Sequence, residues 1–163
     1  MRMLRQNHWA RALSWACLSD VATGADRLIL HASSVALNGR AVVITGASGA
    51  GKSALSLQLM AMGAILVADD RTCLWRQGDM LLADAPDTIR GQIEARFVGI
   101  LGAEAEGPAE VALWVDLDQI EDQRLPEVRH KTVLGVCCPL VHNVQAQHFP
   151  AAILQFLKVG RQS

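Results

Sequence analysis

Apolar residues in this chain occur in short runs that glycine, asparagine and charged residues separate. The runs at 28–37, 41–45 and 64–68 are rich in aliphatic and β-branched side chains, which is typical of buried strands. Residues 53–62 contain Leu, Met and Ala without β-branching, and Gly63 follows them, so this segment is predicted to be a helix that ends at the glycine. The pattern therefore predicts a chain in which strands outnumber helices.

A β-hairpin is predicted around the Asn-Gly pair at positions 38–39, which lies between two apolar runs. A two-residue turn fixes the pairing of its strands, so Leu37 should face Arg40, and the same register should continue outward. Extended to its end, this register places His31 opposite Gly46. A histidine on a strand is more often structural, but here the register would bring it to the end of the hairpin.

The remaining apolar runs predict further strands and one more helix. Residues 72–76 and 80–83 form a second predicted hairpin, and residues 132–138 form a further strand. A final helix is predicted to begin at Pro150, a residue favoured in the first turn, and to end at Gly160. These elements place the chain in the α/β class, with strand-rich sheets.

A phosphate-binding motif lies between the strand at 41–45 and the helix at 53–62. It fits the pattern G-x-x-x-x-G-K-[ST] and consists of Gly46, Ala47, Ser48, Gly49, Ala50, Gly51, Lys52 and Ser53. Its glycines allow several backbone N–H groups to point inward, and the helix that follows adds the positive end of its dipole. Lys52 would reach the β- and γ-phosphates of a nucleotide, and the Ser53 hydroxyl would bind Mg²⁺.

Two apolar runs end in acids, and either could be the Walker B strand. The run at 64–68 ends in Asp69 and Asp70, so one carboxylate could serve the metal and the other could act as a base toward a hydroxyl. The run at 111–115 ends in Asp116. A solvated turn after a strand is the alternative to a functional role.

Glu94 and Arg96 are predicted to share one face of an extended segment. A carboxylate suits Mg²⁺ and a guanidinium suits phosphate, so the pair could serve a nucleotide site. The alternative is a surface ion pair worth about 0–1 kcal/mol.

Composition narrows the class of protein. A chain of 163 residues, with 51% apolar and 19% charged residues, is expected to form one core domain, here assigned to residues 25–163, after a peripheral or poorly ordered extension at 1–24. The net charge of −1 provides no basic field for nucleic acid, and no apolar run approaches the ~20 residues of a membrane span. The four cysteines include no C-x-x-C pair and are expected to be buried thiols in a reducing compartment, and the five histidines lack metal-binding spacing.

Residues 28–103 resemble the catalytic domain of the HPr kinase/phosphorylase family. Four features match in order: His31 before the hairpin, the phosphate-binding loop, Ala68-Asp69-Asp70-Arg71, and the segment Glu94-Ala95-Arg96-Phe97-Val98-Gly99-Ile100, which resembles the family signature Glu-x-Arg-Gly-x-Gly-Ile. The resemblance implies an α/β P-loop kinase domain of the HPr kinase and phosphoenolpyruvate carboxykinase type, with strand-rich mixed sheets around the P-loop helix. It also implies an ATP-dependent cytoplasmic kinase that phosphorylates a serine of an HPr-type phosphocarrier and assembles as a homo-oligomer, commonly a hexamer.

The resemblance also implies roles for individual side chains. Asp69 would take the proton of the acceptor serine as general base, and Asp70 and His31 would support it. Arg96 would lie near the transferred group. In the nucleotide site, Lys52 would hold the phosphates of ATP, while Ser53 and Glu94 would bind Mg²⁺.

The chain departs from the family pattern at several points. It resembles a short variant without the family's N-terminal domain, Ala47 stands where many members carry an acid, and Phe97 replaces the signature glycine. Many family members also remove the phosphate by phosphorolysis, so the resemblance leaves a phosphorylase activity open. The late Lys-x-Gly-Arg loop, which handles phosphate and partner in the family, has no counterpart around 139–143, and this departure bears on phosphorolysis and on the identity of the substrate. Two alternatives stay open: a regulatory nucleotide-binding module with weak or no transfer, and a P-loop kinase of small molecules.

Overall fold

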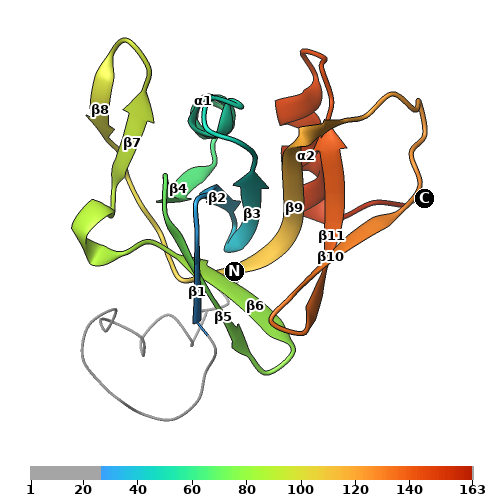
Figure 1. The fold of residues 1–163 in the computed structure, drawn as a ribbon, viewed down its shortest axis with the longest axis horizontal. Helices are drawn as coiled ribbons and strands as arrows, with labels where there is room; N and C mark the ends of the chain where they lie inside the picture. The colour runs from blue at the N-terminus through green and yellow to red at the C-terminus, as the bar shows by residue number, and fades with distance from the viewer. Residues whose placement is uncertain (1–26, 163) are drawn as a thin grey trace, which may run out of the picture.

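The computed structural model describes residues 27–162, and its strands form one large sheet and one separate two-stranded ribbon (Figure 1). The expected extension at 1–24 and Cys17 lie outside the described residues. The strand-rich mixed α/β fold expected from the sequence is present.

Four neighbouring strands form the part of the sheet that carries the phosphate-binding motif. In sheet order they are β9 (Ala109–Ile120), β3 (Arg40–Thr45), β2 (Ser33–Leu37) and β4 (Ile65–Ala68). Strand β3 runs parallel to β9 and antiparallel to β2, and the predicted hairpin register is confirmed, because Leu37 pairs with Arg40.

The other strands extend the sheet beyond β9. They are β1 (Arg27–Leu30), β5 (Thr72–Gln77), β6 (Met80–Asp84), β10 (Arg129–Val133) and β11 (Val136–Asn143). Strand β9 contacts three of its neighbours in turn: β6 near its beginning, β3 along most of its length, and β11 near its end. Because β3 and β11 both run parallel to β9, all three strands end at the same edge of the sheet.

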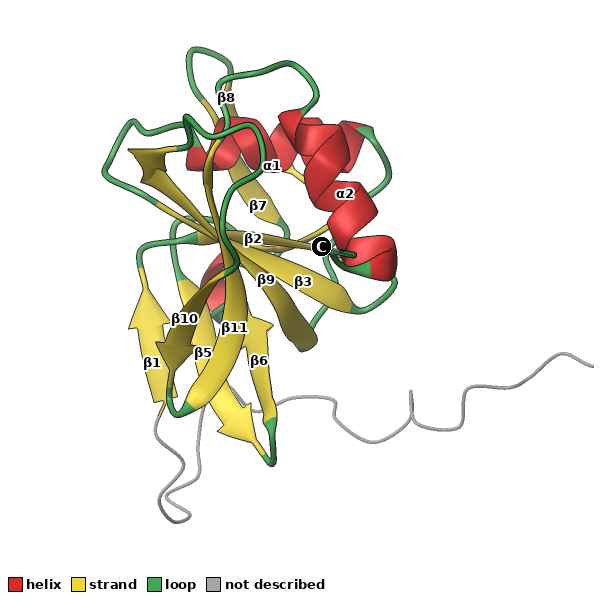
Figure 2. Ribbon diagram, turned by 90° about the vertical axis from the view of Figure 1, so that its right-hand side faces the viewer, coloured by secondary structure: helices red, strands yellow, loops and turns green. Residues whose placement is uncertain are grey.

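Helices α1 (Lys52–Ala61) and α2 (Phe149–Val159) pack on the same side of the central strands (Figure 2). Both were predicted from the sequence to within a residue or so at each end. A 3₁₀ turn, η1 (Asp87–Ile89), leads into the ribbon of β7 (Gln92–Ala95) and β8 (Gly99–Gly102), which lies beside α1 in Figure 1. Within residues 27–162, no helix is long and apolar enough to cross a membrane.

The core has two parts, one on each face of the central strands. Along β3, Val42 and Ile44 point into the cluster under the helices, while Ala41 and Val43 point into the cluster lined by β5, β6 and β10. Strands that are covered on both faces need apolar residues at every position, and this explains why the run at 41–45 shows no alternation.

The sequence predicted one strand over residues 28–37, but the structure contains two strands there. Strand β1 ends at Leu30, the chain bends at His31 and Ala32, and β2 begins at Ser33. The reason is a change of partner: β1 pairs with β5, and the Thr72 hydroxyl on β5 donates to the Ala32 carbonyl over 2.9 Å. The β2–β3 ladder therefore ends before His31, which does not lie opposite Gly46 as expected.

The predicted strand at 132–138 is likewise two strands. A tight turn at Leu134 and Gly135 joins β10 to β11, and both turn residues have positive φ, 49° and 77°. One cysteine prediction is also wrong: Cys138 on β11 is buried, but its neighbour Cys137 is exposed because successive strand residues face opposite ways. Cys73 is buried as expected.

Candidate active site

The phosphate-binding motif forms a tight loop between β3 and α1. Gly51 has a φ of 100° immediately before the helix, and Leu55 donates to the Gly51 carbonyl as the first helical hydrogen bond, over 2.9 Å. Gly49 also has a positive φ of 83°, a conformation that residues with a side chain rarely adopt. The first turn of α1 contains no acidic residue of its own, and the positive end of the helix faces the loop.

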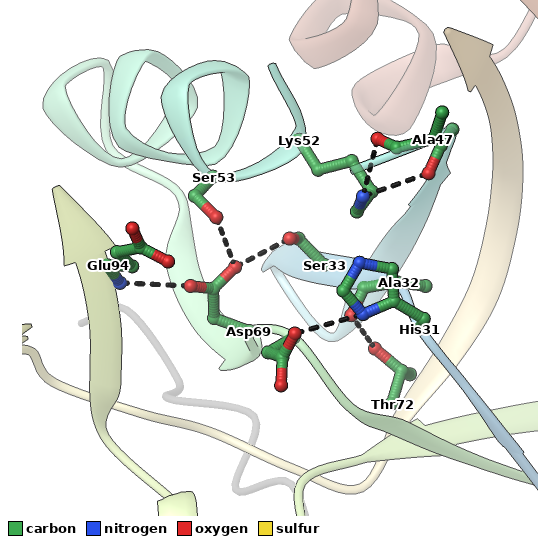
Figure 3. Close-up of polar contacts among 11 residues, drawn as sticks. His31, Ala32, Ser33, Ala47, Lys52, Ser53, Asp69, Thr72 and Glu94 are labelled. Atoms are coloured by element: carbon green, nitrogen blue, oxygen red, sulfur yellow. Dashed lines mark hydrogen bonds and ion pairs between the residues drawn. The ribbon is translucent and has the colours of Figure 1, made fainter. Parts of the chain in front are cut away.

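The ammonium group of Lys52 lies against the loop itself. Its Nζ donates to the carbonyl oxygens of Gly46 and Ala47 over 2.9 and 3.0 Å, and the residue is only 7% exposed (Figure 3). A lysine held in this way has its charge directed toward the beginning of the loop, where it can exchange carbonyl oxygens for phosphate oxygens.

Asp69, directly after β4, is the buried acid of the site. Its Oδ1 accepts from the hydroxyls of Ser33 and Ser53 over 2.5 and 2.8 Å, and its Oδ2 accepts from the backbone N–H of Glu94 over 2.9 Å (Figure 3). The residue is 5% exposed. These donors satisfy the buried charge, and they connect β2, α1 and β7 through one carboxylate.

Asp70 and His31 form a second pair next to Asp69. The Nδ1 of His31 lies 2.9 Å from Oδ1 of Asp70, and both side chains are more than half exposed. Asp70 has a φ of 65°, which separates its side chain from the buried contacts of Asp69. The bend at His31, which replaced the predicted continuous strand, brings the imidazole to this acid.

The structure brings Glu94 and Arg96 to the site in different ways. The backbone of Glu94 reaches Asp69, while its side chain is exposed on β7. Arg96 lies in the turn after β7, so the two residues are not on one strand as predicted. A Cβ placed on Gly49 would lie 3.7 Å from Nη2 of Arg96, which puts this guanidinium beside the phosphate-binding loop.

Two acids were candidates for the Walker B position, and they make different contacts. Asp69 accepts from Ser53, the last residue of the motif, whereas Oδ1 of Asp116 accepts from the backbone N–H of Asp118 over 3.0 Å. The pairing of a buried carboxylate with the motif serine therefore belongs to β4 and not to β9.

Sequence reasoning missed two residues of this region. Ser33, which is 1% exposed, donates to Asp69, and Asp118 accepts from the backbone N–H of Ala47 over 2.8 Å. The adjacent serines inside the apolar run at 28–37 were a signal for the first, because a buried hydroxyl requires a partner. No local pattern distinguishes Asp118 from other acids near the end of an apolar run.

The donor set suits a magnesium ion that is held together with phosphates. Among residues 27–162 no cluster of three His, Cys, Asp or Glu side chains could hold a metal. Mg²⁺ in nucleotide sites is usually bound by one or two protein oxygens plus phosphates and waters, and the Ser53 hydroxyl and Asp69 carboxylate, 2.8 Å apart, provide such oxygens.

Comparisons with known proteins agree with the described fold. The family model for the HPr serine kinase C-terminal domain matches residues 23–134. The HPr kinase/phosphorylase of Alkaliphilus metalliredigens is 38% identical over 102 residues, which are 61% of this chain and 33% of that protein. That of Chloroherpeton thalassium is 35% identical over an alignment of 124 residues, which covers 68% of this chain and 36% of that protein. The chain thus spans about a third of the length of these curated relatives.

One solved structure, described as the Hpr(Ser) kinase/phosphatase from Coxiella burnetii, shares the fold. It superposes with a TM-score of 0.67 at 24% sequence identity, covering 80% of this chain and 94% of that one.

Proposed function

The chain belongs to the HPr serine kinase C-terminal domain family, and from this premise we propose that it is an ATP-dependent kinase that phosphorylates a serine of an HPr-type phosphocarrier protein. The observation that supports this proposal most directly is the contact between Ser53 of the phosphate-binding loop and the buried carboxylate of Asp69, over 2.8 Å. This contact joins the phosphate-binding loop to the acid that would act as the base toward the acceptor hydroxyl.

The proposed reaction is transfer of the γ-phosphoryl group. The hydroxyl oxygen of the acceptor serine forms a bond to the γ-phosphorus, the bond from that phosphorus to the β–γ bridging oxygen breaks, and ADP leaves. The proton of the serine passes to Asp69, whose Oδ1 exchanges one of its present hydroxyl donors for the substrate. A positioned base of this kind contributes about 10²–10⁴-fold to the rate.

Two cationic side chains at the loop would neutralise the negative charge of the phosphates. Lys52 would leave the carbonyls of Gly46 and Ala47 for the β- and γ-phosphates, and Arg96 would approach the transferred group from the turn after β7. When bound, Mg²⁺ would add further neutralisation, held by Ser53 and the exposed Glu94 carboxylate.

The exposed pair of His31 and Asp70 would support the base. The exposed Asp70 carboxylate, 2.9 Å from the imidazole, follows Asp69 in the chain without entering its buried hydrogen bonds. We propose that the pair orients the incoming serine. We also propose a cytoplasmic homo-oligomer, a hexamer by family resemblance, which light scattering of the purified protein would test.

The decisive experiment is incubation with labelled ATP, Mg²⁺ and an HPr-type protein, followed by mapping of the modified residue. We expect phosphoserine on the carrier, and Asp69→Asn should lower the rate by orders of magnitude while ATP binding stays nearly intact. Asp79→Asn is a matched control, because this acid is fully exposed in the β5–β6 turn. Full activity of the Asp69→Asn variant would remove Asp69 from the chemistry.

A nucleotide-binding regulator is the second candidate function. The observation in its favour is that residues 134–148, which include the β10–β11 turn and all of β11, contain no lysine or arginine. Tight binding of ATP with no transfer to any carrier, under conditions in which a related kinase is active, would favour this function.

A further inference from the structure

Two carboxylates hold the phosphate-binding loop from opposite sides of β3. In the order β9-β3-β2-β4, Asp69 follows β4 on one side, while Asp118 lies near the end of β9 on the other. Asp69 accepts from Ser53 at the last position of the motif, and Asp118 accepts from the Ala47 N–H at its second position. The loop is therefore fixed near both ends by acids from different strands.

The contact of Asp118 is supported by its surroundings. Its own backbone N–H donates to Oδ1 of Asp116 over 3.0 Å, which fixes the chain just before its side chain meets the loop. Gly46 packs closely here: a Cβ at this position would lie 3.0 Å from the Cβ of Leu117 and 3.4 Å from Oδ1 of Asp118. The φ of Gly46 is 153°, so the absence of a side chain is needed both for the conformation and for the close approach.

The peptide unit that Asp118 contacts is also one of the two that hold Lys52. The Ala47 N–H donates to Asp118 over 2.8 Å, and the carbonyls of Gly46 and Ala47 accept from the Lys52 ammonium over 2.9 and 3.0 Å. The Gly46 carbonyl belongs to the same peptide plane as the Ala47 N–H, so one plane connects the carboxylate to the ammonium. Rotation of that plane would break both contacts together.

A carboxylate beside a polyphosphate site has an electrostatic disadvantage, because it repels the ligand. Asp118 is exposed and is not one of the oxygens around Ser53, so binding of the metal does not account for it. The hydrogen bond from the loop backbone to Asp118 can offset this repulsion. A loop that is already held in its binding conformation loses less conformational freedom when the ligand binds.

We propose that Asp118 is a positioning residue that keeps the first peptide planes of the phosphate-binding loop, and through them Lys52, in the conformation that receives ATP. This inference rests on the proposed function, in which the loop binds a nucleotide. Asp118 acts through the loop and takes no part in the transfer step.

The variants Asp118→Ala and Asp118→Asn separate the hydrogen bond from the charge. Alanine removes both, whereas the asparagine carbonyl still accepts from Ala47 and lacks the negative charge. We expect Asp118→Ala to raise the Kd for MgATP by about tenfold, the effect of one lost hydrogen bond. Asp118→Asn should stay within about threefold of the original protein, or bind more tightly because the repulsion is gone. Asp79→Ala, at the distant β5–β6 turn, should change nothing.

Two measurements test the proposal on the full chain. Hydrogen–deuterium exchange of the peptide that spans residues 46–51, without nucleotide, should be faster in Asp118→Ala than in the original protein or in Asp118→Asn. Titration with MgATP and steady-state kinetics should show that KM rises in Asp118→Ala while kcat at saturating ATP changes by less than about twofold.

The outcomes distinguish the inference from the function on which it rests. If the original protein binds MgATP and Asp118→Ala binds it equally well, the role of Asp118 is overturned and the kinase proposal stands. If Asp118→Asn is as weak as Asp118→Ala, the hydrogen bond to Ala47 is not the cause. If the original protein binds no nucleotide, both proposals fail.

Discussion

The hydroxyl of Ser53 donates to Oδ1 of Asp69 over 2.8 Å, and this bond joins the first turn of α1 to the end of β4. Two segments that are 16 residues apart in the chain thereby meet at the point where a nucleotide-bound metal would lie. The serine therefore belongs both to the proposed metal site and to the fold, and mutation can separate the two contributions.

Ser53→Ala should weaken the dependence of ATP binding on Mg²⁺ and lower the free energy of unfolding by about 1–2 kcal/mol, because the buried Asp69 carboxylate loses one donor. Calorimetric titration with ATP, with and without Mg²⁺, measures the first effect, and urea unfolding measures the second.

A matched control lies one turn further along α1. Ser56 is fully buried, and its hydroxyl has no hydrogen-bond partner among the described residues. Ser56→Ala should therefore leave MgATP binding unchanged and keep or raise the unfolding free energy, because the unpaired hydroxyl is removed. Equal losses of stability in the two variants would show that the Ser53 hydroxyl has no special contact in solution.

The pair of His31 and Asp70 should matter for activity far more than for stability. Both side chains are more than half exposed, and ion pairs of that kind contribute about 0–1 kcal/mol. We expect His31→Gln and Asp70→Asn to unfold at nearly the original urea concentration but to transfer phosphate more slowly. Their double variant should be no slower than the worse single variant, and fully additive losses would mean that the two side chains act separately.

Phe97 is strained, and replacing it should stabilise the protein. Its φ is 66°, an unfavourable conformation for an aromatic residue, and its side chain is fully exposed, so burial does not offset the strain. Phe97→Gly should raise the unfolding free energy by about 0.5–1 kcal/mol. Val98→Gly, at the next exposed position, which lacks a positive φ, should lower it instead. A loss in both variants would contradict this explanation.

The stability of the protein should fall as the pH rises past the normal titration range of glutamate. Burial, and next the Glu104 carboxylate, raise the pKa of Glu106 from its usual 4.5, while a hydrogen bond with the backbone of Gly39 acts in the opposite direction. The folded protein then binds this proton more tightly than the unfolded chain does. The resulting contribution to stability is complete at pH values below the pKa that Glu106 has in the unfolded chain. It is lost as the pH rises through the pKa that Glu106 has in the folded protein.

Glu106→Gln should flatten this dependence and unfold at a higher urea concentration than the original protein at neutral pH. One carboxylate oxygen of Glu106 is buried without a hydrogen-bond partner in the described part of the chain, which favours a neutral side chain. Urea unfolding across a pH series measures the slope, and Glu104→Gln should reduce the slope only in part. An unchanged slope in the glutamine variant would assign the dependence to another group.

Patterns confined to neighbouring residues predicted their elements well. The Asn-Gly turn gave the register of β2 and β3, and the glycine-rich motif with its strand and helix gave the loop. In each of these cases the interactions that determine the structure join residues close together in the chain, so the local sequence is enough to predict them.

Features that depend on distant partners were missed. The bend at His31 arises because β1 pairs with β5. The hydrogen bond from Thr72 to the Ala32 carbonyl, which holds this bend, joins residues that are 40 positions apart. The hydrogen bond from Ala47 to Asp118 spans 71 residues. The two-strand structure around Leu134 could have been read from Gly135, since a glycine inside an apolar run often marks a turn.

The backbone N–H of Glu94 donates to Oδ2 of Asp69, and this hydrogen bond attaches the β7–β8 ribbon to the buried acid. A displacement of this carboxylate would reach the ribbon through that one hydrogen bond, and the turn that carries Arg96 and Phe97 joins the two strands of the ribbon. The coupling between the buried acid and this exposed turn therefore depends on a single backbone donor.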